Sequence, residues 1–171
     1  MDSSSTLVTD LLVTDAFLIT GTIEPRVKRL STYLEEVQST FVSVKDAKLV
    51  DLRSRNTITT PRILVNRERI VLAHEFLDAV SDTGLKALST ERELVQIRAF
   101  HVGAVNFEIA GSVRPGAYEV SDRSRRFFVI EKPRLRGIEF KEGADELAVL
   151  KDLEYLVVAK HRLSYIYDFN E

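Results

Sequence analysis

The sequence has no cysteine among its 171 residues. Disulfides, thiolate nucleophiles and cysteine metal sites are therefore excluded, and burial of apolar surface alone must stabilise the chain. No stretch approaches the ~20 consecutive apolar residues that a membrane-spanning helix needs. The polar start, residues 1–5 (MDSSS), lacks the basic and apolar regions of a signal peptide. We therefore expect a cytoplasmic protein.

The residue patterns of common catalytic and cofactor sites are also missing. The seven glycines are scattered singly, so no glycine-rich loop is available to hold a phosphate. No serine lies in a nucleophile-elbow pattern. The three histidines, His74, His101 and His161, lack the spacing of a helical zinc motif and are expected in loops or at strand ends. We expect no catalytic residue, no metal and no cofactor, although an enzyme with a site between two units stays a remote alternative.

One stretch of the chain occurs twice. Residues 17–25 (FLITGTIEP) recur as residues 107–115 (FEIAGSVRP), an offset of 90 positions. Residues 41–49 then match residues 127–135 at an offset of 86, and residues 63–72 match residues 156–165 at an offset of 93. Offsets that drift in this way are typical of conserved strands joined by loops of different length. The sequence therefore predicts a tandem duplication.

The repeat predicts two small, mainly β units: residues 7–73, a partly helical connector over 74–92, and residues 93–171. Each unit has about five short strands, as in a small barrel. Gly21 and Gly111 lie in mid-strand and predict a structural hinge where the strand bends sharply. The first unit also has the spacing of a short helix over residues 30–37, with Ser31 as its N-cap. We expect only a turn at the equivalent place in the second unit, and a short helix over residues 145–152.

This pattern resembles the Sm-like family, which includes Sm and Lsm proteins and bacterial Hfq. The resemblance is carried by residues 19–23 (ITGTI), 41–47 (FVSVKDA) and 65–71 (VNRERIV). It implies a five-stranded, strongly bent barrel that pairs edge to edge with its neighbour. The Asp and Asn that face a nucleotide in Sm proteins have no equivalent here, because residues 27–40 occupy that turn, so RNA binding is not implied. Another small barrel of the SH3 type remains an alternative.

A basic cluster in the second unit is the strongest candidate for a binding site. Arginine next to phenylalanine can contact a phosphate and stack on a base, as single-stranded nucleic-acid binders do. Alternation from the repeat predicts Phe128 and Ile130 inside and Phe127 outside. A solvated strand face, or an interface with acidic residues of the connector, is the alternative (Glu75, Asp78, Asp82 and Glu91). The cluster comprises Arg123, Arg125, Arg126, Phe127, Lys132, Arg134 and Arg136.

The leading functional hypothesis is a non-enzymatic tandem Sm-like module for protein-protein interaction or oligomeric assembly. Two units of marginal size with open strand edges favour it, because an unblocked edge invites pairing with another chain. The alternative is binding of RNA or single-stranded nucleic acid through the basic face of the second barrel. The formal net charge of −2 argues against a protein that coats nucleic acid through bulk charge, although a local basic patch stays an alternative.

Overall fold

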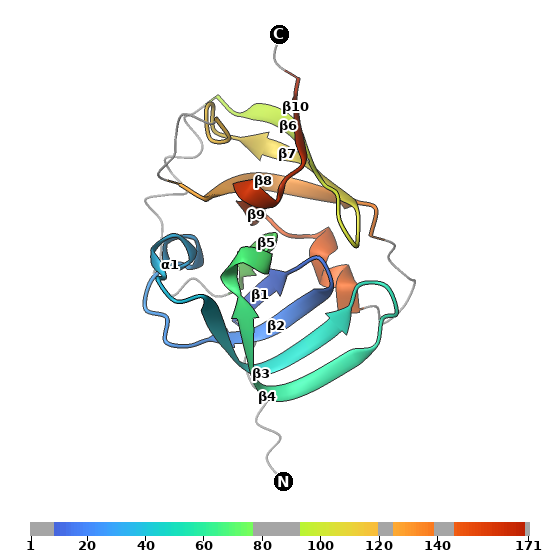
Figure 1. The fold of residues 1–171 in the computed structure, drawn as a ribbon. Coiled ribbons are helices and arrows are strands. Elements are labelled where there is room, and N and C mark those ends of the chain that lie inside the picture. The colour runs from blue at the N-terminus through green and yellow to red at the C-terminus, as the bar shows by residue number, and fades with distance from the viewer. Residues whose placement is uncertain (1–8, 77–92, 120–124, 139–145, 170–171) are drawn as a thin grey trace.

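The computed structural model describes residues 9–76, 93–119, 125–138 and 146–169 (Figure 1). The elements of the first half are β1 (Asp10–Val13), β2 (Phe17–Ile23), α1 (Leu30–Glu36), β3 (Phe41–Asp51), β4 (Thr57–Asn66), the 3₁₀ helix η1 (Arg67–Arg69) and β5 (Leu72–Glu75). Those of the second half are β6 (Val95–His101), β7 (Phe107–Val113), β8 (Phe127–Arg136), the 3₁₀ helix η2 (Glu146–Lys151), β9 (Tyr155–Ala159), the 3₁₀ helix η3 (Lys160–Arg162) and β10 (Tyr165–Asp168).

All strands of the described residues belong to one antiparallel sheet, in the order β10-β6-β7-β8-β9-β5-β1-β2-β3-β4. The predicted mainly β class is confirmed. The sheet is open, however, and two closed barrels are not what the structure contains. The reason lies at the centre of the sheet, where β5 pairs with β1 on one side and with β9 of the second half on the other. Its second edge thus joins the two halves.

The two halves have the same internal strand order, β5-β1-β2-β3-β4 and β10-β6-β7-β8-β9. Each half contributes five antiparallel strands, so every strand of the second half runs opposite to its equivalent in the first half. Since the strand order is the same in both halves, this reversal means that the two halves direct opposite faces of the sheet toward their cores. Ile19 and Val42 accordingly lie in one core cluster, while their repeat equivalents Ile109 and Phe128 lie in the other. The sheet therefore curls one way in the first half and the other way in the second.

The two hydrophobic cores are shared between the halves. One contains Leu11 and Val13 of β1 together with Ile109 of β7, and the other contains Leu12 of β1 together with Phe127 of β8. Every residue of β1 and β5 is buried, so these strands pack on both faces. Each half thus completes its core with side chains from the other.

Gly21 and Gly111 lie at equivalent bulges. The pairing register shifts beside each glycine, and the opposing residues Asp46 and Lys132 both have φ of 49°. A Cβ atom on Gly21 would lie 2.6 Å from Val44 Cγ1, and one on Gly111 would lie 2.3 Å from Ile130 Cγ2. Real side chains do not approach so closely. Only glycine therefore allows the second and third strands of each half to cross at this distance.

Helix α1 covers the inner face of the first half with Leu30 and Leu34, both fully buried. Ser31 is not its N-cap as the sequence predicted, because the helix starts at Leu30, after Arg29, whose side chain makes no capping bond. Glu75 of β5 takes this role instead, since its Oε2 accepts the Leu30 N–H at 3.1 Å. The last strand of the first half, β5, ends at this same residue, Glu75.

Candidate interaction surfaces

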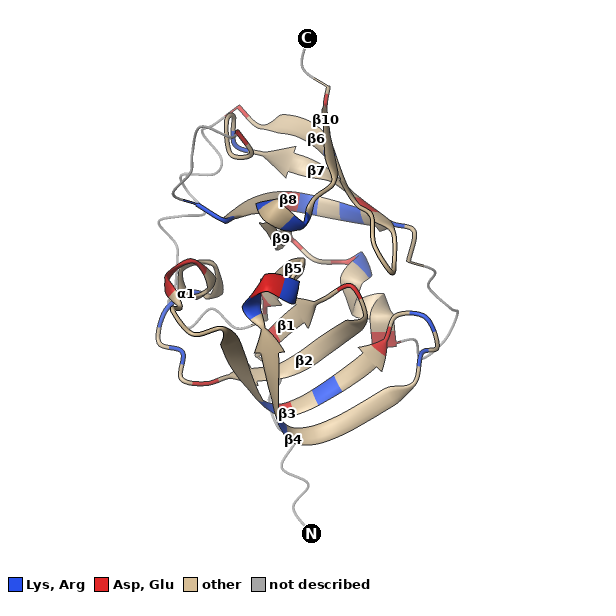
Figure 2. Ribbon diagram, viewed as in Figure 1, with Lys and Arg blue, Asp and Glu red and all other residues tan. Residues whose placement is uncertain are grey.

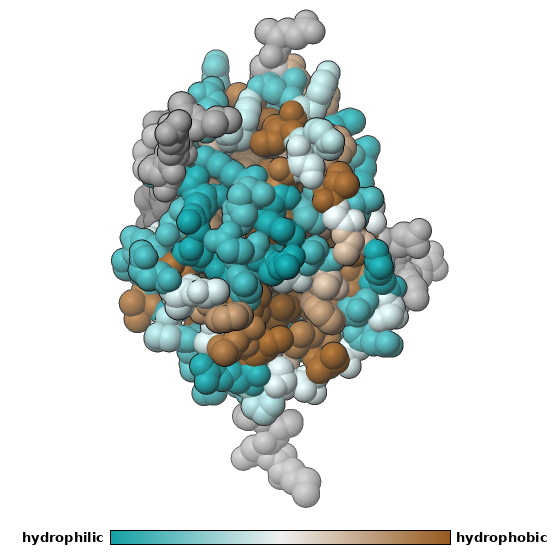
Figure 3. Space-filling model, viewed as in Figure 1, coloured by the Kyte–Doolittle hydropathy of each residue, from teal (hydrophilic) through white to brown (hydrophobic). Residues whose placement is uncertain are grey.

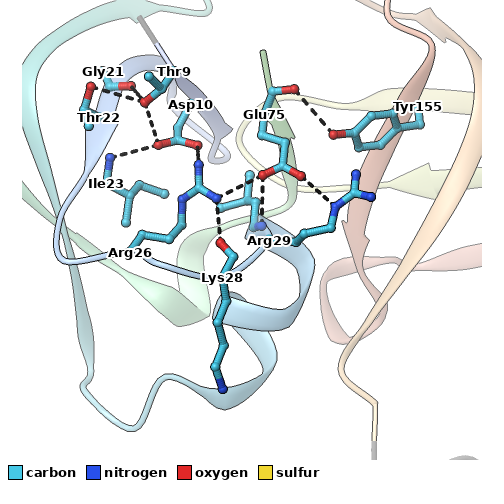
Figure 4. Close-up of polar contacts among 11 residues, drawn as sticks. Thr9, Asp10, Gly21, Thr22, Ile23, Arg26, Lys28, Arg29, Glu75 and Tyr155 are labelled. Atoms are coloured by element: carbon cyan, nitrogen blue, oxygen red, sulfur yellow. Dashed lines mark hydrogen bonds and ion pairs between the residues drawn. The ribbon is translucent and has the colours of Figure 1, made fainter. Parts of the chain in front are cut away.

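A buried ionic network fixes the chain between β2 and α1 (Figure 4). Arg26 bridges two carboxylates, with Nη2 2.5 Å from Asp10 Oδ1 and Nη1 2.9 Å from Glu75 Oε2. Asp10 Oδ2 also accepts the Ile23 N–H at 2.9 Å, and Glu75 Oε1 accepts Arg29 Nε at 3.1 Å. The side chains of Asp10, Arg26 and Glu75 are at least nine-tenths buried. The charges of these three side chains are paired in a site closed to solvent, so the network serves structure and offers no ligand site.

The joint between the halves combines strand pairing with side-chain contacts. Leu72 pairs with Val158, and Ala73 with Val157. The pairing continues at one end, where the Ala159 N–H donates to the Val71 carbonyl at 2.9 Å. At the other end the Tyr155 hydroxyl donates to the Glu75 carbonyl at 3.4 Å. Antiparallel pairing of β5 with β9, in this register, is the geometry by which one half of this chain recognises the other.

A polar surface covers one side of this joint. Glu35 of α1 accepts the backbone N–H groups of Arg126 and Phe127, and Glu68 of η1 pairs with Arg126 at 2.9 Å and with His161 of η3 at 3.2 Å. Figures 2 and 3 show charged and hydrophilic residues gathered over the centre of this view, where the halves meet. Burial lowers the pKa of His161 below its usual 6.5, outweighing the opposite effect of Glu68. The charges that face one another here belong to the joint itself.

Two strand edges remain unpaired within the described residues, those of β4 and β10. The Arg67 N–H donates to the Thr40 carbonyl in line with the β3–β4 ladder, so by alternation the backbone groups of Arg62 and Leu64 point away from β3. On β10 the Phe169 N–H donates to Gln96 of β6, so Ile166 and Asp168 point to the open side. Both edges thus present donors and acceptors without a strand partner.

Apolar and aromatic side chains accompany these edges. Ile58 and Leu64 of β4 are 53% and 51% exposed, and Tyr165 and Tyr167 of β10 are 68% and 57% exposed. An apolar area is visible on the first half in Figure 3, below the hydrophilic centre. An exposed strand edge with apolar side chains invites pairing with another chain. They are the most distinctive surface feature of the described residues.

The predicted basic cluster does not form a single surface. Phe127 is only 5% exposed and packs in the core beside α1, so it is not accessible to stack on a base. Arg126 is engaged by Glu68, and Lys132 occupies the bulge opposite Gly111. Arg123 lies outside the described residues, and Arg125 is exposed just before β8. Glu75, expected on an acidic connector, is instead buried in the ionic network.

Phe128 and Ile130 point inward, as alternation from the repeat predicted. Phe127 does lie on the opposite face of β8, but α1 of the first half covers that face at this point. The burial of Phe127 therefore reflects a contact between the halves that no pattern within β8 encodes.

Arg134 and Arg136 remain exposed, on the outer face of the second half. They have no ion-pair partner among the described residues. Tyr165, Tyr167 and Phe169 follow at every second position on the same face, and the Arg98 guanidinium lies 5.1 Å from the centre of the Phe169 ring. These aromatic residues were missed, although their spacing in residues 165–169 (YIYDF) is the signal that could have found them.

The remaining candidates are readily placed. His74 lies in β5, His101 ends β6 and His161 lies in η3. The described part of the chain contains no group of three or more His, Asp or Glu side chains placed to hold a metal ion. No helix of the described residues is long and apolar enough to span a membrane.

The chain was compared with protein family models, with curated proteins and with solved structures. No family model, no curated protein and no solved structure matches it.

Proposed function

We propose that this chain is a non-enzymatic assembly module, built from two divergent copies of one Sm-like unit, that associates through its open strand edges. The observation that carries this proposal is the joint between β5 and β9, where two such edges already pair inside the chain. The edges of β4 and β10 present the same kind of unpaired backbone groups at either end of the sheet. Strand addition at such an edge needs only a second extended segment.

Sedimentation velocity from low micromolar to several hundred micromolar protein tests the proposal, together with hydrogen exchange of the β4 and β10 amides. We expect concentration-dependent association with slower exchange at these edges. Leu64→Pro removes an outward N–H and should weaken association, whereas Leu64→Thr loses the same side chain but keeps the N–H. A monomer at all concentrations, with edge amides that exchange at one constant rate, would contradict the proposal.

A second candidate function is binding of single-stranded nucleic acid on the outer face of the second half. The specific observation is the row of Tyr165, Tyr167 and Phe169 next to Arg98, with Arg134 and Arg136 on the same face. Side chains two apart on a strand lie roughly 6.5 to 7 Å from each other, so the row offers successive stacking platforms beside cationic groups.

Fluorescence anisotropy with a labelled single-stranded RNA at two salt concentrations tests this candidate. Phosphate contacts predict affinity that falls steeply with added salt. The double variant Arg134→Glu with Arg136→Glu should abolish binding. The control double variant Lys28→Glu with Lys45→Glu makes the same change of charge on the first half and should retain most of the RNA affinity. Equal effects of the two double variants would argue against this face.

A further inference from the structure

The free edges of the sheet are the repeat equivalents of the two strands that pair at the joint. The offset of 93 residues relates η1 to η3, the end of β4 to β9, and β5 to β10. Leu64 and Val65 of β4 therefore correspond to Val157 and Val158 of β9, and Leu72 and Ala73 of β5 correspond to Tyr165 and Ile166 of β10. The chain thus carries, at its two ends, one unpaired copy of each side of its own joint.

We propose that the partner of each free edge is a second copy of this chain, with β10 of one copy antiparallel to β4 of the next. This inference rests on the proposed function and specifies its partner and register. Inside the chain Leu72 pairs with Val158 and Ala73 with Val157. Replacing each residue of these pairs by its repeat equivalent places Tyr165 opposite Val65, and Ile166 opposite Leu64, of the neighbouring copy.

Backbone direction and alternation agree with this register. Ala73 and Val157 form a pair whose backbone groups face each other across the joint, because Val71 and Ala159, two residues away on either strand, are joined by a hydrogen bond. Their equivalents Ile166 and Leu64 are residues whose backbone groups point to the open edges. The donors and acceptors are therefore in phase without any change of strand conformation.

Side chains across this register are complementary. Ile166 meets Leu64, which is half exposed in the single chain. Two residues further along each strand, Asp168 meets Arg62, so opposite charges lie directly across from each other. Asp168 already accepts the Tyr118 hydroxyl, and Arg62 Nε already donates to Ser43 Oγ at 2.8 Å. A carboxylate and a guanidinium both have capacity for a further bond.

Pro61 does not obstruct this pairing. It lies three residues before Leu64, opposite Asp46 of β3, where the ladder between β3 and β4 is already interrupted. The segment that forms the proposed contact, residues 62–65, contains no proline. Pro61 therefore prevents strand pairing before residue 62 and leaves residues 62–65 of the β4 edge able to pair.

The contact between copies is weaker than the joint inside the chain. At the internal joint Leu11, Leu18 and Val50 on the outer face of the first half are buried against the second half. Strand pairing places Arg98, Glu108 and Arg136 at the equivalent positions of the second half. These polar residues cannot repeat the apolar packing, so the copies are held by their strand edges and separate on dilution.

A charge exchange tests the register. Asp168→Arg alone and Arg62→Asp alone each place like charges opposite each other in a homotypic contact, and we expect each to weaken self-association about fivefold. Mixing the two single variants brings the introduced guanidinium opposite the introduced carboxylate at one contact and keeps the native pair at the other, so association should return to the wild-type level. The double variant in one chain should recover as well. Tyr118→Phe controls for loss of the hydroxyl bond to Asp168.

Each outcome is informative. Circular dichroism of the single variants, which change exposed residues, verifies that they fold. Association that persists in the wild type but is not restored on mixing would overturn the head-to-tail register while leaving assembly through the edges in place, for example as a β4–β4 or β10–β10 pair. A wild-type chain that stays monomeric would overturn both this inference and the proposed function.

Discussion

Glu35 Oε1 lies 2.6 Å from the backbone nitrogen of Phe127, so the helix of the first half holds the start of a strand in the second half. Glu35 Oε2 also accepts the N–H of Arg126 at 3.0 Å. This single carboxylate satisfies two donors at the point where β8 begins, and it does so across the joint.

Replacing Glu35 should therefore destabilise the whole chain. Glu35→Ala leaves the part-buried Phe127 N–H without an acceptor, which costs about 1 to 3 kcal/mol of unfolding free energy, whereas the exposed Arg126 N–H can bind water instead. Glu36→Ala is the matched control, because the exposed Glu36 carboxylate contacts only the exposed Lys28 among the described residues and its loss should change stability by less than about 0.5 kcal/mol. Urea unfolding measures both. Equal effects of the two variants would show that the contact with Phe127 is unimportant.

The buried network around Arg26 predicts a larger loss. Glu75→Ala removes one carboxylate and leaves Arg26 partly uncompensated in a closed site, which costs about 3 to 5 kcal/mol. It also removes the acceptor for the first N–H of α1. Glu24→Ala breaks an exposed pair with Lys45 and should cost less than about 1 kcal/mol. A Glu75→Ala variant as stable as Glu24→Ala in thermal unfolding would contradict this account.

The bulge glycines predict a steric effect. Gly111→Ala would place a Cβ 2.3 Å from Ile130 Cγ2 and 2.8 Å from the Glu131 carbonyl oxygen, and should cost about 1 to 3 kcal/mol. Gly103→Ala is the control, because the nearest atom there is 3.1 Å away in the side chain of His101. Since the cores are shared, Gly111→Ala should speed hydrogen exchange in both halves by the same factor. Faster exchange in the second half alone would show that the halves unfold independently.

The joint also predicts a pH dependence. Burial lowers the pKa of His161 in the folded chain, so the unfolded chain binds more protons as the pH falls through 6.5. Stability should therefore decrease as the pH is lowered through this value. Glu68→Gln removes the neighbouring charge that opposes the shift and should steepen the decrease, whereas His161→Gln should flatten it. Unfolding midpoints on either side of pH 6.5 measure the effect, and identical pH profiles for all three proteins would refute it.

Much of the local structure could be predicted from the sequence. Strand β2 (Phe17–Ile23) lies within the repeated stretch over residues 17–25, whose apolar residues and glycine recur at matching positions in the second half. The helix predicted over residues 30–37 from its spacing is present as α1 (Leu30–Glu36). These features depend on neighbours in the chain, which is the information that periodicity contains.

Contacts between distant segments could not be predicted. The N-terminus of α1 is capped by Glu75, 45 residues away, where a local rule pointed to Ser31. Phe127 is buried because α1 covers it, although alternation places it outside the barrel. The joining of both halves into one open sheet could not be predicted either, because nothing in the residues of β5 indicates that its second edge pairs with β9. Each of these contacts lies between elements that meet only in the folded chain.

The even number of strands in the whole sheet has a geometric consequence for any association along it. Strand direction is reversed after the five strands of one half and restored after the ten strands of the whole chain. A copy added at either edge therefore has the same orientation as the first copy. A row of such copies is polar: one end always presents β4 and the other always presents β10. Unless the row closes into a ring, it grows at two chemically different ends. A small amount of a variant impaired only at β4, added to wild-type chain, would therefore stop growth at the β4 end and leave the β10 end active.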